Sequence, residues 1–286
     1  MIYGVGMKNY ILYNNLSGNG ASYEKATHLA SLLGEDSIFL NVEDVVYSKL
    51  FSELKEDDNL IICGGDGTLN RFVNDTKETG FKCKVLYYPT GTGNDFLKDI
   101  NITENECPVE INKYIDSLPS VEINGKSYYF LNNVGFGIDG YCCEVGDDLK
   151  KRGKKKINYT AIAIKGLLFH YKPTNAVVTV DGKEYRYKKV WIAPTMNGRF
   201  YGGGMMATPS QDRCSDEISV MVFYGGGRLK TLLAFPSIFK GEHIKHTDMV
   251  QIHSGKQINV KFSEPRTVQI DGETLFGISE YNAKSN

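Results

Sequence analysis

Two glycine-rich loops hold the residues of this chain best suited to bind phosphate. The first follows the apolar run Leu60–Cys63 and reads Gly-Gly-Asp-Gly-Thr over 64–68. The second follows Val85–Tyr88 and reads Pro-Thr-Gly-Thr-Gly-Asn-Asp-Phe over 89–96. Glycine lets backbone amides approach a polyanion closely, and a helix N-terminus attracts negative charge. An acidic side chain here would repel phosphate unless a divalent cation lies between them, so Asp66 predicts metal-bridged phosphate and nucleotide-dependent phosphoryl transfer.

Two carboxylates near the C-terminus, Asp271 and Glu273, could activate a hydroxyl group. An alcohol is a poor nucleophile until its proton can be accepted, and residues two apart share one face of a strand. We expect Glu273 to take the proton and Asp271 to orient the hydroxyl or hold magnesium, and the reverse assignment stays open. Taken alone, Asp271-Gly272 favours an ordinary hairpin turn, as Asp181-Gly182 does elsewhere in the chain.

The first third of the chain alternates strand and helix signals. Strands are expected over 10–13 and 37–40 and before each glycine loop, and helices over 23–33 and 45–54. This alternation predicts a parallel sheet with crossover helices, an α/β, Rossmann-like nucleotide-binding domain. Ligands gather at the carboxyl ends of such strands, where both glycine loops would lie.

Short strands joined by turns dominate the rest of the chain. Two hairpins are expected around Asn124-Gly125 and Asp181-Gly182, and a helix from about 158 to 171. These signals predict a mostly antiparallel β-sandwich as the second domain.

Composition limits the classes of partner. The 33 basic and 34 acidic residues nearly cancel, which argues against nucleic acid. No uncharged apolar stretch approaches the roughly 18 residues of a membrane-spanning helix. Scattered cysteines without zinc-site spacing favour reduced thiols and a cytoplasmic protein. The basic cluster Lys150–Lys156 fits either a solvated loop or contact with an anionic membrane.

Six segments together resemble one known family. Besides the two glycine loops they are Asn14 with Ser17-Gly18, Asn132–Gly137, Gly202–Met205 with Pro209, and Ile270–Glu273. In this order they resemble the diacylglycerol kinase catalytic-domain family, which includes sphingosine, ceramide and related bacterial lipid kinases. The chain departs from the pattern at Asn15, where the family usually has proline.

The resemblance implies two domains and a set of ligand-binding residues. A nucleotide-binding domain would cover 1–118, with 277–286 returning to it, and a lipid-substrate β-sandwich domain would cover 119–276. ATP would be the co-substrate and Mg²⁺ the metal, with Asp66 reaching the phosphates through magnesium. The positions that match nucleotide-lining residues are Asn14, Ser17, Gly18, Gly64, Gly65, Asp66, Gly67, Thr68, Thr92 and Asn94.

The resemblance also implies a structural magnesium site in the second domain. Its ligands would be the Asp216 carboxylate and the backbone carbonyls of Arg213 and Ile218. Glu217 stands where the family usually has glycine, and the stretch from Pro209 is one residue longer. A solvated acidic loop is the alternative.

The activity that the resemblance implies is an ATP-dependent lipid kinase. It would transfer the γ-phosphoryl group to a lipid hydroxyl, most directly converting diacylglycerol to phosphatidic acid in phospholipid metabolism. The enzyme would be cytoplasmic and touch the membrane peripherally. One alternative is a kinase of a soluble substrate, since NAD kinases and phosphofructokinases share the Gly-Gly-Asp-Gly loop. Another is a non-catalytic nucleotide- or lipid-binding protein. The acceptor lipid and the oligomeric state, a homodimer included, stay open.

Overall fold

The protein divides into two compact units, 1–117 and 118–286. The computed structural model describes residues 7–15, 22–34, 36–91, 93–102, 107–154 and 157–286. The division falls one residue before the boundary expected from the sequence.

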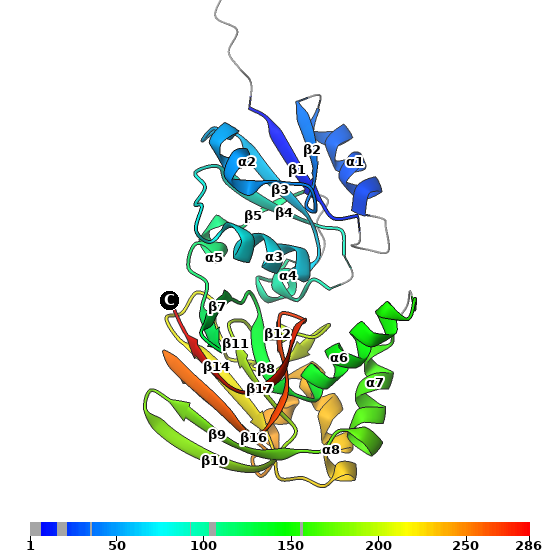
Figure 1. Ribbon diagram of the computed structural model, residues 1–286, viewed down its shortest axis with the longest axis vertical. Helices are drawn as coiled ribbons and strands as arrows, with labels where there is room; N and C mark the ends of the chain where they lie inside the picture. The colour runs from blue at the N-terminus through cyan, green and yellow to red at the C-terminus, as the bar shows by residue number, and fades with distance from the viewer. Residues whose placement is uncertain (1–6, 16–21, 35, 92, 103–106, 155–156) are drawn as a thin grey trace, which may run out of the picture. The chain divides into compact units, whose positions relative to one another are not determined.

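The first unit is an α/β domain (Figure 1). Its described elements are β1 (Asn9–Tyr13), α1 (Ser22–Leu33), β2 (Ser37–Asn41), α2 (Tyr47–Glu53), β3 (Asn59–Gly64), α3 (Asp66–Thr76), β4 (Lys84–Pro89), α4 (Asp95–Asp99), β5 (Val109–Glu110) and α5 (Asn112–Ile115). Among the described residues the strands form one sheet in the order β2-β1-β3-β4-β5. Strands β1 to β4 are parallel, and β5 runs antiparallel to β4. The predicted alternation of strand and helix is therefore confirmed.

The register of the first sheet brings the predicted loops to one edge. Tyr13 pairs with Cys63 and Gly64 pairs with Pro89, so β1, β3 and β4 end side by side. Helix α1 covers one face of these strands, where Ala26 packs in a buried cluster with Ile11 and Ile61. Burial of this apolar surface fixes the strands that carry the loops.

The second unit is mostly β-structure with helices on one side (Figure 1). Its strands are β6 (Ser120–Ile123), β7 (Lys126–Tyr129), β8 (Asn133–Gly137), β9 (Thr174–Val180), β10 (Lys183–Val190), β11 (Ile192–Met196), β12 (Phe200–Tyr201), β13 (Met205–Met206), β14 (Ile218–Phe223), β15 (Val250–Gly255), β16 (Gln257–Ile270) and β17 (Glu273–Lys284). Its helical elements are α6 (Ile138–Lys151), α7 (Tyr159–Lys165), the π-helix η2 (Gly166–His170), α8 (Arg228–Ala234), and the 3₁₀ helices η3 (Phe235–Lys240) and η4 (Glu242–Lys245).

The long strand β16 joins the two parts of this antiparallel sheet. Its first half, 258–262, pairs with β9, and its last residues, 268–270, pair with β8. The order through the described strands is β15-β14-β11-β8-β16-β17-β6-β7, with β9 and β10 attached at β16. The core packs between these parts: the Phe136 ring stacks on Phe262 and Tyr281, with centroids 4.6 and 5.3 Å away.

The C-terminal segment corrects one expectation. Residues 277–286 were expected to return to the first domain, but β17 pairs along β16 and also with β6, all within the second unit. The physical reason is the Asp271-Gly272 hairpin, which turns β17 straight back onto β16.

Local signals in the second unit are confirmed in several places. Asn124-Gly125 and Asp181-Gly182 connect β6 to β7 and β9 to β10, and all four residues have positive φ. The expected helix near 158–171 is α7 followed by η2, and the Asn158 side chain accepts a hydrogen bond from the Ala161 amide at 2.9 Å.

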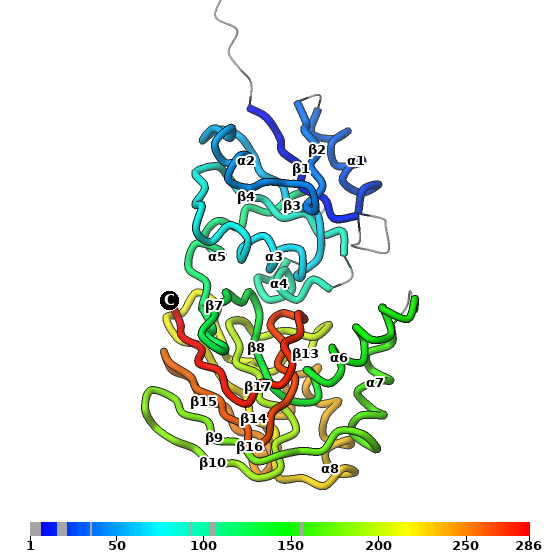
Figure 2. The backbone as a smooth tube through the Cα atoms, in the orientation of Figure 1, coloured from blue at the N-terminus to red at the C-terminus, as the bar shows by residue number. Residues whose placement is uncertain are grey.

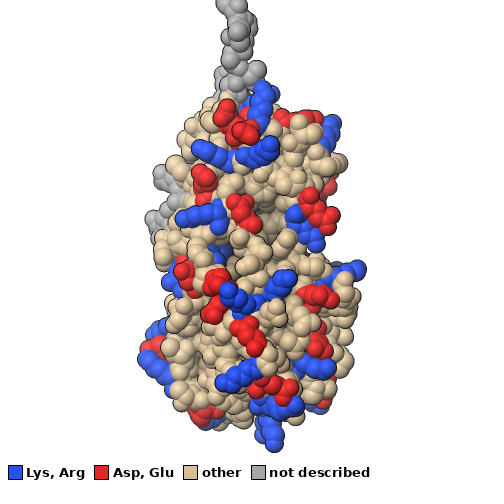
Figure 3. All heavy atoms as spheres, turned by 90° about the vertical axis from the view of Figure 1, so that its left-hand side faces the viewer, with Lys and Arg blue, Asp and Glu red and all other residues tan. Residues whose placement is uncertain are grey.

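The surface charges are mixed in sign, as the balanced composition indicates. Figure 3 shows acidic and basic side chains interspersed over one face, without a large region of one sign. Within the described part of the chain, no helix is both long enough and apolar enough to cross a membrane.

Candidate active site

The two glycine loops of the first unit are held together by direct hydrogen bonds. The Gly64 carbonyl accepts from the amides of Thr90 at 2.9 Å and Gly91 at 3.2 Å. The Asp66 amide donates to the Gly93 carbonyl at 3.2 Å. The loops therefore form one structure at the carboxyl ends of β3 and β4.

The Asp66 carboxylate lies at the N-terminus of α4. Its Oδ2 accepts hydrogen bonds from the amides of Asp95 at 2.8 Å and Phe96 at 3.4 Å. Amides at a helix start attract a negative charge, so this contact stabilises the second loop. The sequence predicts a metal-bridging role for Asp66, with capping of the helix that follows it as the alternative. The structure shows a capping contact, but with α4 rather than with α3, which begins at Asp66 itself.

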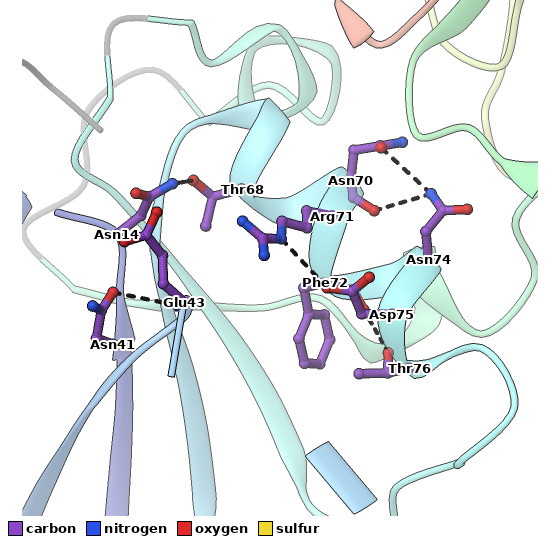
Figure 4. A network of polar contacts seen from close by, with 10 residues as sticks. All are labelled: Asn14, Asn41, Glu43, Thr68, Asn70, Arg71, Phe72, Asn74, Asp75 and Thr76. Carbon is purple, nitrogen blue, oxygen red and sulfur yellow. Dashed lines mark hydrogen bonds and ion pairs between the residues drawn. The ribbon is translucent and has the colours of Figure 1, made fainter. Parts of the chain in front are cut away.

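Asn14 and Thr68 connect the end of β1 to the first glycine loop. The Asn14 amide donates to Thr68 Oγ1 at 3.2 Å, and Figure 4 shows these two side chains facing each other. Thr68 is buried in the first turn of α3. Two residues expected to line the nucleotide with them, Ser17 and Gly18, lie outside the described residues, as does Thr92.

The glycines of the loops have different physical roles. A Cβ at Gly64 would come within 2.4 Å of the Thr68 side chain, and one at Gly65 within 3.2 Å of the Gly93 carbonyl. A Cβ at Gly67 or Gly93 would meet no atom within 4 Å. Gly64 and Gly65 are thus needed for packing, whereas Gly67 and Gly93 leave open space where a phosphate could approach the backbone.

Asn94 and a buried tyrosine support the second loop. Asn94 Nδ2 donates to the Gly91 carbonyl at 3.3 Å, and its Oδ1 accepts from the Tyr87 hydroxyl at 3.4 Å. Burial, and then the charge of Asp66, raise the pKa of Tyr87 well above its usual value, so the phenol stays a neutral donor. Ser22 is a further support that the sequence did not reveal: its hydroxyl lies 2.9 Å from Thr90 Oγ1.

In the second unit the predicted carboxylates lie on a tight hairpin. Asp271 and Gly272, with φ of 46° and 98°, connect β16 to β17, and Ile270 pairs with Glu273 across the turn. Asp271 accepts hydrogen bonds from three consecutive backbone amides, those of Leu131, Asn132 at 2.8 Å and Asn133 at 2.9 Å. Its oxygens are therefore engaged by the loop before β8.

Glu273 differs from its neighbour because it is exposed. It is the first residue of β17, directly after the turn that Asp271 anchors. The Glu273 carboxylate is therefore accessible from solvent, whereas the Asp271 carboxylate is held by backbone amides.

The buried side chains of Gln269 and Asp139 support the same hairpin through hydrogen bonds. The amide of Gly272 donates to Gln269 Oε1 at 2.9 Å, and Gln269 Nε2 donates to Asp139 Oδ2 at 3.2 Å. Burial raises the pKa of Asp139 to about 6, while hydrogen bonds from Gly140 and Gln269 oppose the shift. Asp139 and Gln269 are not among the residues predicted from the sequence; the available signal was an acidic residue directly after the segment Val-Gly-Phe-Gly-Ile, 134–138.

The residues expected to bind a structural magnesium lie in and just after the loop 212–217. The exposed Asp216 carboxylate forms an ion pair with Lys256 Nζ at 2.6 Å. The Arg213 side chain reaches Asn132 Oδ1 at 3.0 Å, and Ile218 begins β14. A magnesium site at these residues stays a prediction. In the described residues, no three His, Cys, Asp or Glu side chains gather as a metal site.

Comparisons with known proteins agree with this arrangement. Residues 8–120 match the family described as the diacylglycerol kinase catalytic domain. Residues 132–280 match the one described as the YegS C-terminal NAD kinase beta sandwich-like domain. The chain belongs to the diacylglycerol kinase catalytic-domain family.

Similar proteins match this chain over most of their length. A Staphylococcus aureus (strain JH9) protein named "Putative lipid kinase" is 28% identical, over 92% of this chain and 89% of its own length. A Bacillus subtilis (strain 168) protein of the same description, YtlR, is 24% identical over 76% and 74%. A crystal structure titled as a "putative diacylglycerol kinase" from Bacillus anthracis shares the fold, with a TM-score of 0.69 and 19% identity over 100% of this chain and 96% of that one.

Proposed function

We propose that this member of the family is an ATP-dependent lipid kinase. The observation that carries the proposal is the hairpin of the second unit, where Asp271 is engaged by three backbone amides and Glu273 is exposed beside it. The joined glycine loops of the first unit support it, because the open backbone at Gly67 and Gly93 suits close approach of phosphate.

The proposed step is phosphoryl transfer to an alcohol. The substrate hydroxyl oxygen forms a bond to the γ-phosphorus of ATP, the bond to the β–γ bridging oxygen breaks, and ADP leaves. The hydroxyl proton passes to the Glu273 carboxylate, while Asp271 holds the turn in place. Magnesium bound with ATP would neutralise phosphate charge, and Asp66 is the residue of the first loop that we propose would contact it.

Diacylglycerol is the acceptor that we propose, with phosphatidic acid as the product. The protein would work in the cytoplasm and meet its substrate at the membrane surface. The cluster Lys150–Lys156 is one proposed contact with anionic lipid. Within it Lys150 pairs with Asp147 at 3.0 Å and Arg152 with Asp148 at 2.8 Å, so part of its charge is already balanced.

Labelled ATP and a panel of detergent-dispersed lipids test the activity. We expect label in phosphatidic acid when diacylglycerol is present, and at least about a hundredfold less with Glu273→Gln. NAD and a sugar phosphate belong in the same panel. A labelled soluble product would replace this proposal with a kinase of a soluble substrate, and nucleotide binding without any product would replace it with a binding protein.

A further inference from the structure

Large apolar side chains are exposed on the helical elements of the second unit. Phe169 of η2 is 71% exposed, and Leu229 and Leu233 of α8 are 67% and 75% exposed. Ile164 of α7 and Phe239 of η3 are exposed as well. We call these five residues the apolar face. Large apolar side chains that are mostly exposed can still gain free energy from burial, and clusters of them are typical of contact surfaces.

The elements that carry the apolar face pack together. Arg228 Nη1 donates to the Leu167 carbonyl at 2.7 Å, which fixes α8 against η2. On their inner sides Leu167, Ala234 and Ile238 belong to one buried cluster. Leu229 and Leu233 are four residues apart and so share one side of α8. Figure 2 shows α7 and α8 along the same edge of the second unit.

The two segments that carry the apolar face are basic in sequence. Residues 157–172 and 224–241 contain no aspartate or glutamate. The same two segments contain basic side chains, namely Lys165, Lys172, Arg228, Lys230 and Lys240. Asp248, outside both segments, pairs with Lys230 and balances part of this charge. In a chain with 33 basic and 34 acidic residues, these segments are locally cationic.

Apolar side chains within a basic rim suit an anionic bilayer. Leucine and phenylalanine enter the boundary between headgroups and acyl chains, and lysine and arginine attract anionic headgroups. We propose that the apolar face inserts into the surface of an anionic membrane. The proposal rests on the proposed function, because a lipid acceptor resides in the bilayer and the enzyme must reach it there.

Vesicle sedimentation tests the insertion directly. The probes are vesicles of phosphatidylcholine alone and of phosphatidylcholine with phosphatidylglycerol. We expect the protein to bind the anionic vesicles more tightly. We expect Phe169→Ser and the double variant Leu229→Ser/Leu233→Ser each to lower the vesicle partition coefficient at least about tenfold. Thermal unfolding should show no loss of stability, because the replaced side chains are exposed.

A matched control comes from the first unit. Leu32 and Val46 are 62% and 63% exposed, so Leu32→Ser/Val46→Ser removes similar apolar surface elsewhere and should leave vesicle binding unchanged. Equal vesicle binding by the wild type and both apolar-face variants would overturn the proposal. So would a sedimenting dimer that becomes a monomer in Leu229→Ser/Leu233→Ser, since the face would then join two copies.

Turnover with detergent-dispersed diacylglycerol separates this inference from the proposed function. The apolar-face variants should keep wild-type turnover in micelles and lose it only on vesicles. If no lipid is phosphorylated in micelles even by the wild type, the proposed function fails, while the vesicle measurement still decides whether the apolar face inserts.

Discussion

The Asp66 carboxylate caps the helix that begins at Asp95, with Oδ2 2.8 Å from the Asp95 amide. Asp66, which the sequence predicts to contact metal-bound phosphate, thus also joins the two glycine loops. A loss of activity on replacing it could come from either role, and only variants that separate charge from capping can tell them apart.

We expect Asp66→Asn to keep the cap and lose the charge. An asparagine oxygen can still accept the Asp95 amide, so the free energy of unfolding should change by less than about 1 kcal/mol. Lipid kinase activity should fall at least about a hundredfold if the carboxylate contacts metal-bound phosphate. Asp66→Ala should add a loss of about 1 kcal/mol of stability. Urea unfolding and turnover measure the two effects, and near-normal turnover by Asp66→Asn would leave Asp66 with the capping role alone.

Alanine substitutions at Gly64 and Gly67 should have opposite effects on stability and on ATP binding. Gly64→Ala should destabilise the first unit by several kcal/mol, because its Cβ would overlap the buried Thr68 side chain. Gly67→Ala should leave stability unchanged or slightly higher, because the site is open and alanine favours helix. We expect Gly67→Ala instead to raise the KM for ATP. An unchanged KM would exclude close approach of the nucleotide at Gly67.

The two Asp-Gly hairpins provide an internal control for Asp271. Asp181 accepts from the amides of Lys256 at 3.0 Å and Gln257 at 2.8 Å, much as Asp271 holds the amides of 131–133. Asp181→Asn and Asp271→Asn should each cost about 1–3 kcal/mol of stability, because each weakens charge-assisted hydrogen bonds. Only Asp271→Asn should also lower turnover. Equal turnover in both variants, measured well below their unfolding temperatures, would show that the second hairpin has no part in the reaction.

For Glu273 we expect a kinetic effect without a structural one. Glu273→Gln should lower kcat about 10²- to 10⁴-fold, the usual contribution of a general base, while ATP binding measured by calorimetry stays nearly the same. The exposed position predicts unchanged stability. An unchanged kcat would show that another group accepts the hydroxyl proton.

Asp139 predicts a specific pH dependence of stability. Its pKa in the folded protein is raised to about 6 from 3.8 because the carboxyl is buried. The folded state therefore binds the proton more tightly than the unfolded state, and stability falls as pH rises from about 4 through 6. The loss is on the order of 3 kcal/mol. Asp139→Asn should remove this dependence, so the difference in unfolding free energy between variant and wild type should grow with pH. A difference independent of pH would contradict the raised pKa.

The same variant should disturb the hairpin. An introduced amide would present an NH₂ group to Gln269, turning the Gln269 amide and removing its bond to the Gly272 amide. Turnover of Asp139→Asn should then be lower than that of the wild type even above about pH 6, where the wild type has lost stability and the variant has not. Stability and activity that change in parallel would argue against this positioning effect.

Local sequence predicted what depends on local physics. The helix start near Asn158 and the three Asp-Gly or Asn-Gly turns lie where their residue types indicate, because local backbone preferences favour them. The glycine loops also follow the predicted strands, but hydrogen bonds between the two loops hold them in place. Other features depend on distant partners. Lys256 reaches Asp216 from 40 residues away, β17 finds β6, and Asp139 becomes buried beneath Gln269. Charge or strand propensity alone could not have selected these partners.

The course of β16 has a consequence for how the second unit opens. One strand carries the pairings with β9, β17 and β8, although its register with β17 shifts between 261 and 268, so neither part of the sandwich can lose its edge without exposing the other. Amide protons of the paired segments 258–261 and 268–270 should exchange with solvent only through global unfolding, and those of the exposed stretch between them should exchange sooner. Glu273 pairs with Ile270, the last residue of this strand, so its backbone is held by the core of the second unit.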